Sequence, residues 1–223
     1  MLSKRLQVVL DMIDIDAKLA DIGCDHGYLA MHAIYKGIKK VELVDNKIGP
    51  LNVAKENLQN FTNDIQIKYS LSDGLSDIDN DINVVAICGM GGDLISKIIN
   101  DNINVARSMN YLVLEANTNV YYLREFLVNN KFEIFDEEIC YDRGKYYQII
   151  KTKYNNKEYT LSNVEKEYGP ILLNKKSDVF INYIKDNIEK INKIILKNEK
   201  SSTYFNDKIK ELNEVLNETN RNI

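Results

Sequence analysis

Residues 18–29 read K-L-A-D-I-G-C-D-H-G-Y-L, and this stretch decides the fold of the chain. Residues 19–22 predict a short strand, a turn between Gly23 and Gly27 follows, and a helix is expected over residues 28–35. In open α/β sheets, ligands bind outside the carboxyl ends of strands, at turns of this kind. Glycine suits such a turn because it has no side chain to keep a ligand away from the backbone. The alternative is an ordinary tight turn that binds nothing.

The spacing within this turn separates two classes of nucleotide-binding protein. It is G-x-x-x-G rather than the G-x-G-x-x-G of dinucleotide-binding proteins, which argues against a dehydrogenase. An acid at the strand end, Asp21, followed by Gly23 and Gly27, is closer to the first motif of methyltransferases that use S-adenosylmethionine. Asp25 occupies the middle position of that motif, which is usually glycine.

Length and composition limit the possible architectures. The chain has 223 residues, 44% of them hydrophobic, which is enough for one domain with a small appendage. It has no apolar run near the ~20 residues that span a bilayer, and charges interrupt its first apolar residues, so we expect neither a membrane segment nor a signal peptide. The isolated Cys24, Cys88 and Cys140 form no metal-site pattern. We expect a cytoplasmic protein with reduced thiols and no metal.

Two further strand ends carry acidic residues that suit a nucleoside. A second strand, residues 40–44, leads to Asp45, about 20 residues beyond the glycine turn, where a carboxylate accepts both ribose hydroxyls of a nucleoside cofactor. A third strand, residues 65–69, precedes S-D-G-L, whose Asp73 is placed to accept from an adenine amino group. The alternatives are a helix-capping role for Asp45 and a D-G turn without a ligand.

The fourth strand, residues 82–88, is almost entirely apolar, as is typical of a central parallel strand. It runs into G-M-G-G at residues 89–92, and three glycines in four residues cost backbone entropy. This cost makes sense if a ligand and a substrate base press against the backbone there. A mobile loop is the alternative.

Three more strands complete the predicted sheet. They cover residues 111–115, 132–140 and 145–151, and D-R-G-K joins the last two as a hairpin. The helix that follows residue 115 is expected to place Leu123 inside and Arg124 outside. The pattern predicts a Rossmann-like α/β fold with a mostly parallel seven-stranded sheet and one antiparallel last strand.

The remainder of the chain is helical in pattern. Ser162 and Glu165 form a capping box, and isoleucines then recur at spacings of three and four from Ile181 to Ile195. After a break at residues 201–203, a second apolar seam runs from Phe205 to Leu216. We expect residues 1–158 to form a catalytic domain and residues 159–223 a coiled-coil-like helical hairpin. The alternative is two helices packed on the main sheet.

These motifs together resemble the bacterial tRNA adenine-22 N1-methyltransferases, the TrmK family. The similarity covers roughly the first 150 residues. Two places depart from the family pattern: Ala30 replaces a usual proline, and E-A-N at residues 115–117 replaces Q-P-N. The motifs that carry the resemblance are L-S-K-R-L, A-D-I-G-C-D-H-G-Y-L, G-P-L-N-V-A-K-E-N, S-D-G-L, G-M-G-G, L-R-E-F-L and G-K-Y-Y.

The resemblance implies a class I methyltransferase with S-adenosyl-L-methionine as cofactor and tRNA as substrate. N1 of adenine lies on the Watson–Crick edge, so the target base must leave its pair or stack to react. Asp25 is the expected acceptor for the exocyclic amino group, His26 orients it or moves a proton, and Tyr28 stacks on the base. The structural alternative for His26 is an ordinary hydrogen-bonded group in the turn.

The remaining expected site residues bind the cofactor or RNA. The net charge of −4 means that RNA binding must come from a local patch. The candidate residues of this patch are Lys4, Arg5 and Arg124.

Two other functions stay open as alternatives. One is a methyltransferase for another RNA position or a small molecule, and the other is a non-catalytic module that binds cofactor or RNA. We expect a monomer. The expected cofactor-binding residues are Asp21, Gly23, Cys24, Gly27, Asp45, Asn46, Asp73, Gly74, Gly89, Met90 and Gly91.

Overall fold

The computed structural model describes residues 2–61, 64–197 and 202–217. The chain divides into two compact units, Met1–Ile171 and Leu172–Ile223. This division lies later than the expected one at residues 158 and 159. The reason is local: the helix at residues 163–168 is tied to the first unit by the side chain of Arg124, whose Nη1 donates to the carbonyls of Lys166 and Glu167.

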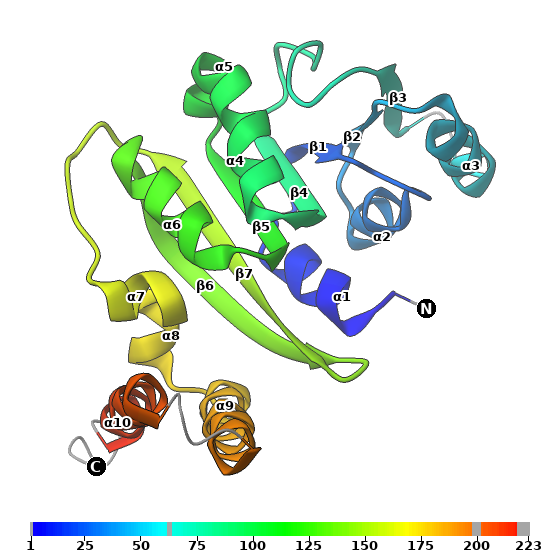
Figure 1. Cartoon of the computed structure of the whole chain (residues 1–223). Helices are drawn as coiled ribbons and strands as arrows, with labels where there is room; N and C mark the ends of the chain where they lie inside the picture. The colour runs from blue at the N-terminus through cyan, green and yellow to red at the C-terminus, as the bar shows by residue number, and fades with distance from the viewer. Residues whose placement is uncertain (1, 62–63, 198–201, 218–223) are drawn as a thin grey trace. The chain divides into compact units, whose positions relative to one another are not determined.

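The first unit contains a seven-stranded sheet in the order β3-β2-β1-β4-β5-β7-β6 (Figure 1). Strands β3, β2, β1, β4 and β5 pair in parallel, whereas β7 is antiparallel to both β5 and β6. The predicted seven-stranded sheet with one reversed strand is confirmed. The strands are β1 (Lys18–Ile22), β2 (Lys40–Asp45), β3 (Gln66–Leu71), β4 (Val84–Gly91), β5 (Tyr111–Thr118), β6 (Phe132–Asp142) and β7 (Lys145–Tyr154).

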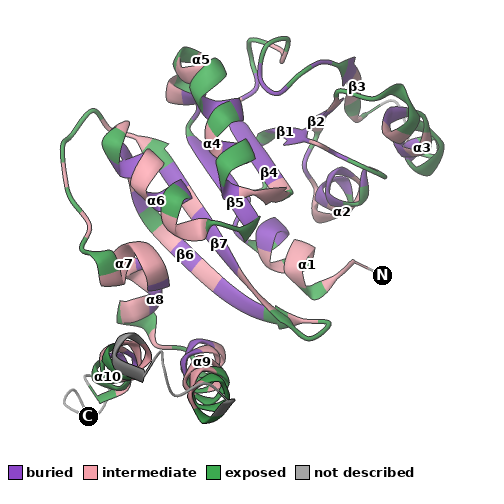
Figure 2. Ribbon diagram, in the orientation of Figure 1, coloured by how far each residue is buried: buried purple, intermediate pink, exposed green. Residues whose placement is uncertain are grey.

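Helices cover both faces of the sheet because successive strand side chains point to opposite sides. Leu19 packs in one hydrophobic cluster with α1, α2 and α3, while its neighbour Ala20 packs in the other with α4, α5 and α6. The central strands β1, β4 and β5 are therefore buried along most of their length (Figure 2). The helices of the first unit are α1 (Lys4–Asp11), α2 (Tyr28–Lys36), α3 (Ile48–Leu58), α4 (Gly92–Asp101), α5 (Ile103–Ser108), α6 (Val120–Asn129) and α7 (Asn163–Tyr168), and α8 (Pro170–Lys175) spans the boundary between the two units.

The segment G-M-G-G is not a mobile loop, because β4 continues through Gly91 and pairs with β5. Cys88 is opposite Glu115, and after a register shift Met90 is opposite Ala116. Gly89 has a positive φ of 79°, which permits this irregularity. At Gly92, an added Cβ would lie 2.3 Å from the carbonyl oxygen of Asn119. Close packing of backbone against backbone, rather than a ligand, therefore explains the last glycine of this segment.

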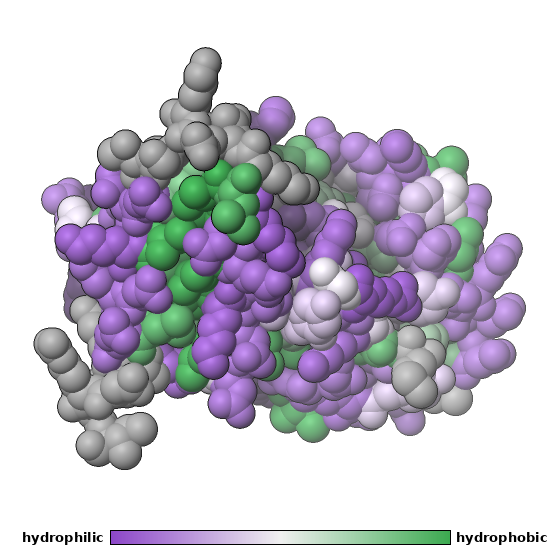
Figure 3. Space-filling model, turned by 60° about the horizontal axis from the view of Figure 1, so that its bottom comes forward, coloured by the Kyte–Doolittle hydropathy of each residue, from purple (hydrophilic) through white to green (hydrophobic). Residues whose placement is uncertain are grey.

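The second unit consists mainly of α9 (Asp178–Lys197) and α10 (Ser202–Asn217), which pack against each other. Its buried side chains include Phe180 and Ile184 on α9 and Leu212 on α10. Figure 3 shows hydrophobic side chains gathered in a stripe over these two helices. Of the break expected at residues 201–203, residue 201 lies outside the described residues, and α10 already begins at Ser202.

No helix within the described ranges is both long enough and apolar enough to cross a bilayer.

Candidate active site

Two adjoining cavities lie at the carboxyl ends of β1, β2 and β4. The larger has a volume of about 450 Å³ and the smaller about 280 Å³. They share Gly23, Asp45, Asn46, Lys47 and Met90, so they form one continuous site. Most residues expected at the site line one or both cavities, namely Asp21, Gly23, Cys24, Asp25, His26, Tyr28, Asp45, Asn46, Asp73, Gly74, Gly89, Met90 and Arg5.

The turn between β1 and α2 is held in place from β2. The amides of Gly23 and Cys24 both donate to the carbonyl of Val44, at 2.8 and 3.1 Å. Gly23 has a φ of +70°, and an added Cβ would lie 2.1 Å from Cε of Met90. A side chain at this position would thus displace Met90 from the wall of the cavity.

Gly27, which was expected to bind cofactor, lies in close helix packing. It lines neither cavity. It precedes α2 with a φ of +71°, and an added Cβ would lie 2.8 Å from Cδ2 of Leu43 and 3.1 Å from Cβ of Ala54. Gly27 is needed so that α2 and α3 can pack closely over β2. Gly91, also expected to bind cofactor, likewise lines neither cavity and lies beside Thr118.

The three expected catalytic residues occupy one wall of the larger cavity. Asp25 has a left-handed backbone (φ 49°), and its side chain is 74% exposed. Nε2 of His26 lies 3.5 Å from Oδ1 of Asp25, and the rings of His26 and Tyr28 lie 5.7 Å apart. The backbone carbonyl of His26 accepts from the side-chain amide of Asn57, and this bond anchors the turn to α3. The arrangement presents a carboxylate, an imidazole and a phenol ring together to solvent at the mouth of the cavity.

Asp45 lies where the two cavities meet. Its Oδ1 accepts from the backbone N–H of Lys47 at 2.9 Å, which fixes the orientation of the carboxylate. This bond is an Asx turn directly before α3, whose N-cap residue Lys47 has no side-chain cap, so it is not the helix-capping contact weighed as the alternative role for Asp45. Because this bond uses only Oδ1, the other carboxylate oxygen of Asp45 stays available for a ligand.

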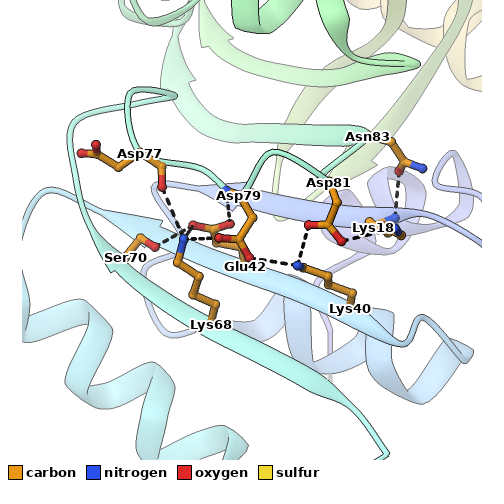
Figure 4. A network of polar contacts seen from close by, with 9 residues as sticks. All are labelled: Lys18, Lys40, Glu42, Lys68, Ser70, Asp77, Asp79, Asp81 and Asn83. Carbon is orange, nitrogen blue, oxygen red and sulfur yellow. Dashed lines mark hydrogen bonds and ion pairs between the residues drawn. The ribbon is translucent and has the colours of Figure 1, made fainter.

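The loop that carries Asp73 is anchored by a network of ion pairs (Figure 4). Nζ of Lys68 lies 2.5 Å from Asp79 and 3.0 Å from the buried Glu42, and Glu42 also accepts from the N–H of Asp79. Lys40 contacts Asp79 and Asp81 at 2.9 and 2.6 Å. These contacts hold the loop between β3 and β4 across β2, and thereby place Asp73 and Gly74 in the smaller cavity.

A third group of polar residues borders the larger cavity, and the sequence did not identify it as a unit. Nη1 of Arg5 donates to Oε2 of Glu115 at 2.9 Å and to Oδ1 of Asn117 at 3.2 Å. The amide of Gly89 donates to the same Glu115 oxygen, and Asn117 donates to the carbonyl of Gly89. Burial raises the pKa of Glu115, opposed by the charge of Arg5. In the sequence, the feature that could have indicated this group is Glu115, a glutamate at the end of an otherwise apolar predicted strand.

Asp21 is a buried carboxyl group with an unusual protonation. Burial, aided by the charges of Asp45 and Asp25, raises its pKa to about 7, against the lowering effect of the N–H of Ala30. Its Oδ2 has no hydrogen-bond partner among the residues that the structure describes. A buried acceptor without a partner at a cavity wall is suited to a cationic donor from a ligand.

The three cysteines are not nucleophiles. Burial raises the pKa of the Cys24, Cys88 and Cys140 thiols, so they stay protonated at neutral pH. Cys24 and Cys88 line the larger cavity as small apolar groups. No group of three or more potential metal ligands occurs within the described part of the chain.

Arg124 was expected outside, as an RNA contact, and this expectation is wrong. Its side chain is fully buried, and its Nε donates to Oε1 of Glu137 at 2.8 Å. The helix α6 forms as expected, but the side of it that carries Arg124 is covered by β6, β7 and α7. Lys4 is exposed at the start of α1 and lines neither cavity.

Comparison with known proteins identifies the family. The family model described as tRNA (adenine(22)-N(1))-methyltransferase, TrmK, matches residues 19–220. The chain belongs to the TrmK family. A TrmK relative from Bacillus subtilis, named tRNA (adenine(22)-N(1))-methyltransferase, is 30% identical over 81% of this chain and 78% of its own length.

Two solved structures similar to this TrmK-family chain contain the cofactor or its product. Sp1610 of Streptococcus pneumoniae, solved in complex with S-adenosyl-L-methionine, has a TM-score of 0.86 at 29% identity and covers 97% of this chain and 100% of its own. M. capricolum TrmK in complex with S-adenosyl-homocysteine has a TM-score of 0.81 at 28% identity, with 97% and 98% covered.

Proposed function

We propose that this protein transfers a methyl group from S-adenosyl-L-methionine to N1 of adenine 22 in the D-arm of tRNA. The observation that carries the proposal is the continuous site at the ends of β1, β2 and β4, in a chain of the TrmK family. Its wall combines carboxylates for a nucleoside cofactor with an exposed group that can contact a base. The protein acts as a monomer in the cytoplasm.

The residues of the site fit the cofactor chemically. The unpartnered buried acceptor of Asp21 suits the cofactor's ammonium group, Asp45 suits the ribose hydroxyls, and Asp73 in the smaller cavity suits the adenine amino group. When bound, the cofactor supplies a methyl group already activated by its positive sulfur. The protein therefore mainly has to align the target nitrogen with that group.

Asp25, His26 and Tyr28 act on the acceptor base. The carboxylate of Asp25 accepts from the exocyclic amino group and raises the electron density of N1, and it also offsets the positive charge that methylation creates. His26, within 3.5 Å, orients this carboxylate, and Tyr28 stacks on the extruded base. The exposure of all three side chains supports this role, because a macromolecular substrate has to reach them.

Lys4 and Arg5 at the start of α1 contact RNA phosphates. Lys4 is exposed, whereas Arg5 is held by Glu115 and Asn117 beside the larger cavity. Arg5 thus combines a positioned charge with a location near the target base.

The protonation of Asp21 makes cofactor binding depend on pH. Below pH 7 this carboxyl keeps its proton and cannot pair with an ammonium group, so affinity should rise as the pH rises. We expect the Kd for S-adenosylmethionine to be about fivefold higher at pH 6 than at pH 7, a range in which an α-ammonium group still keeps its proton. Calorimetric titration across this range tests the expectation.

The control is Asp21→Asn, whose Kd for S-adenosylmethionine should be higher than that of wild type at pH 7 and nearly constant between pH 6 and pH 7. A wild-type Kd that does not change with pH would contradict the proposed pairing. The stability of the apoprotein gives a second readout, and its pH dependence has the opposite sign to that of cofactor affinity. Because native Asp21 retains a proton that the unfolded chain loses above its ordinary pKa of 3.8, this group lowers stability as the pH rises from about 4 to 7.

The proposed reaction is tested by incubating the protein with methyl-labelled S-adenosylmethionine and tRNA, and mapping the modified nucleotide. Label at N1 of adenine 22, absent from a transcript with guanine at position 22, is the expected result. Label at another nucleotide would replace the proposal with a different RNA site. Cofactor binding without transfer to RNA would leave a small-molecule enzyme or a non-catalytic module.

A further inference from the structure

A third cavity lies beside the active site, at the hairpin between β6 and β7. Its volume is about 320 Å³. Arg5 and Asn117 line both this cavity and the larger cavity of the active site, so the two spaces are neighbours. The remaining lining residues come mostly from the hairpin and its turn, D-R-G-K-Y-Y at residues 142–147, and neither the cofactor nor the target base accounts for them.

The charge of this third cavity is mainly positive. Arg143 and Lys145 lie on either side of the hairpin glycine, and within the described residues neither forms an ion pair. Arg5 is the third cation, and it also pairs with Glu115. The single acid of the lining, Asp142, accepts from the backbone N–H of Arg5 at 3.3 Å. Two cations without acidic partners favour an anionic ligand.

Aromatic rings complete the lining. Tyr146 and Tyr147 both border the cavity, and the Tyr146 ring lies 4.8 Å from that of Tyr141. The guanidinium of Arg5 lies 5.2 Å over the ring of Tyr147. Cations next to aromatic rings are the combination that binds single-stranded nucleic acid, because the cations contact phosphate and the rings stack on bases.

We propose that the third cavity binds the nucleotide adjacent to the target adenine. Arg143 and Lys145 contact its phosphate, its base stacks against Tyr146, and Arg5 and Asn117 separate it from the target base. Extruding one base from an RNA arm bends the backbone on both sides of it, so a neighbouring subsite stabilises the reactive conformation. This inference rests on the proposed function, since it needs a nucleotide in the active site.

The test replaces the two cations together, as Arg143→Ala with Lys145→Ala. Their matched control is Lys153→Ala with Lys157→Ala, which removes the same charge near the far end of β7 and in the segment that follows it. We expect kcat/KM for tRNA to fall about tenfold in the hairpin variant only, with the Kd for S-adenosylmethionine unchanged in both. The dependence of log(kcat/KM) on log salt should become shallower by about 0.7 for each single-strand phosphate that the variant no longer neutralises.

Base stacking is tested with Tyr146→Leu and with D-arm RNA carrying an abasic residue on either side of adenine 22. Wild-type protein should bind one of the two abasic RNAs about tenfold more weakly than intact RNA. The Tyr146→Leu variant should bind that abasic RNA and intact RNA equally. Thermal unfolding of each variant verifies that it folds.

The outcomes distinguish this inference from the proposed function. Fluorescence anisotropy with a labelled D-arm hairpin measures RNA binding without catalysis. If wild-type protein methylates adenine 22 but the hairpin variant matches its control in kcat/KM and salt dependence, the subsite is wrong and the proposed function stands. If wild-type protein binds the hairpin RNA through these residues but does not methylate it, the proposed function fails and the neighbouring target adenine with it, and only the contact between the third cavity and RNA stands.

Discussion

Replacing Arg124 with alanine is expected to lower the free energy of unfolding by about 3–5 kcal/mol, because it removes the cation that faces a buried carboxylate. Arg124 is fully buried, and its guanidinium joins four elements of the first unit. It donates to Glu137 on β6, to Gln148 on β7, and to the carbonyls of Lys166 and Glu167 on α7. Denaturant titration of wild type and variant measures the difference.

The surroundings of Arg124 leave little room for relaxation. An added Cβ on Gly169 would lie 2.7 Å from Nη2 of Arg124 and 2.6 Å from Oε2 of Glu137. That Glu137 oxygen also accepts from the amide of Ile171 at 2.9 Å. Removing the guanidinium therefore takes a charged donor from several acceptors at once, in a place that water cannot easily enter.

The control is Lys131→Ala, which removes an exposed cation paired with Glu158 at 3.3 Å. Exposed ion pairs are worth about 0–1 kcal/mol, so this variant should unfold nearly as wild type does. Arg124→Ala combined with Glu137→Ala should cost less than the sum of the two single changes, because no buried charge remains. A loss below about 1 kcal/mol for Arg124→Ala would show that the cluster does not stabilise the fold.

Replacing Asp25 with asparagine is expected to lower kcat for tRNA methylation about 100-fold, because a neutral amide cannot offset the charge formed on the base. The Kd for S-adenosylmethionine should stay within about twofold of wild type, since the side chain is 74% exposed at the mouth of the cavity. Asparagine is the appropriate substitution, because it tolerates the left-handed backbone of this residue (φ 49°). Alanine there would add backbone strain of about 1–2 kcal/mol.

Single-turnover kinetics with saturating cofactor measures the chemical step, and calorimetry measures cofactor affinity. Asp16→Asn is the control, because it neutralises an exposed aspartate of the turn before β1 and lines none of the cavities described above. If cofactor affinity falls as much as kcat, Asp25 belongs to the cofactor site instead. An unchanged kcat would remove it from the mechanism.

The strands and the glycine turns could be predicted from the sequence, because the patterns that indicate them are local. The apolar run before Cys88 predicted a central strand, and D-R-G-K predicted the hairpin of β6 and β7. Strand ends were less accurate: β4 and β5 each extend about three residues further than expected. Their extra residues pair with each other across the sheet, and such pairing depends on the neighbouring strand rather than on local composition.

The chain by itself determined the order of strands and helices, the acidic residues at the strand ends and the resemblance to the TrmK family. Only the tertiary structure decided that Arg124 is buried, that Gly27 serves helix packing and that Arg5, Glu115 and Asn117 form one group beside the cavity. Residues 5 and 115 are far apart in the sequence and meet only after α1 packs beside β5. The periodicity of a helix shows which side chains share a face, whereas the fold decides what covers that face.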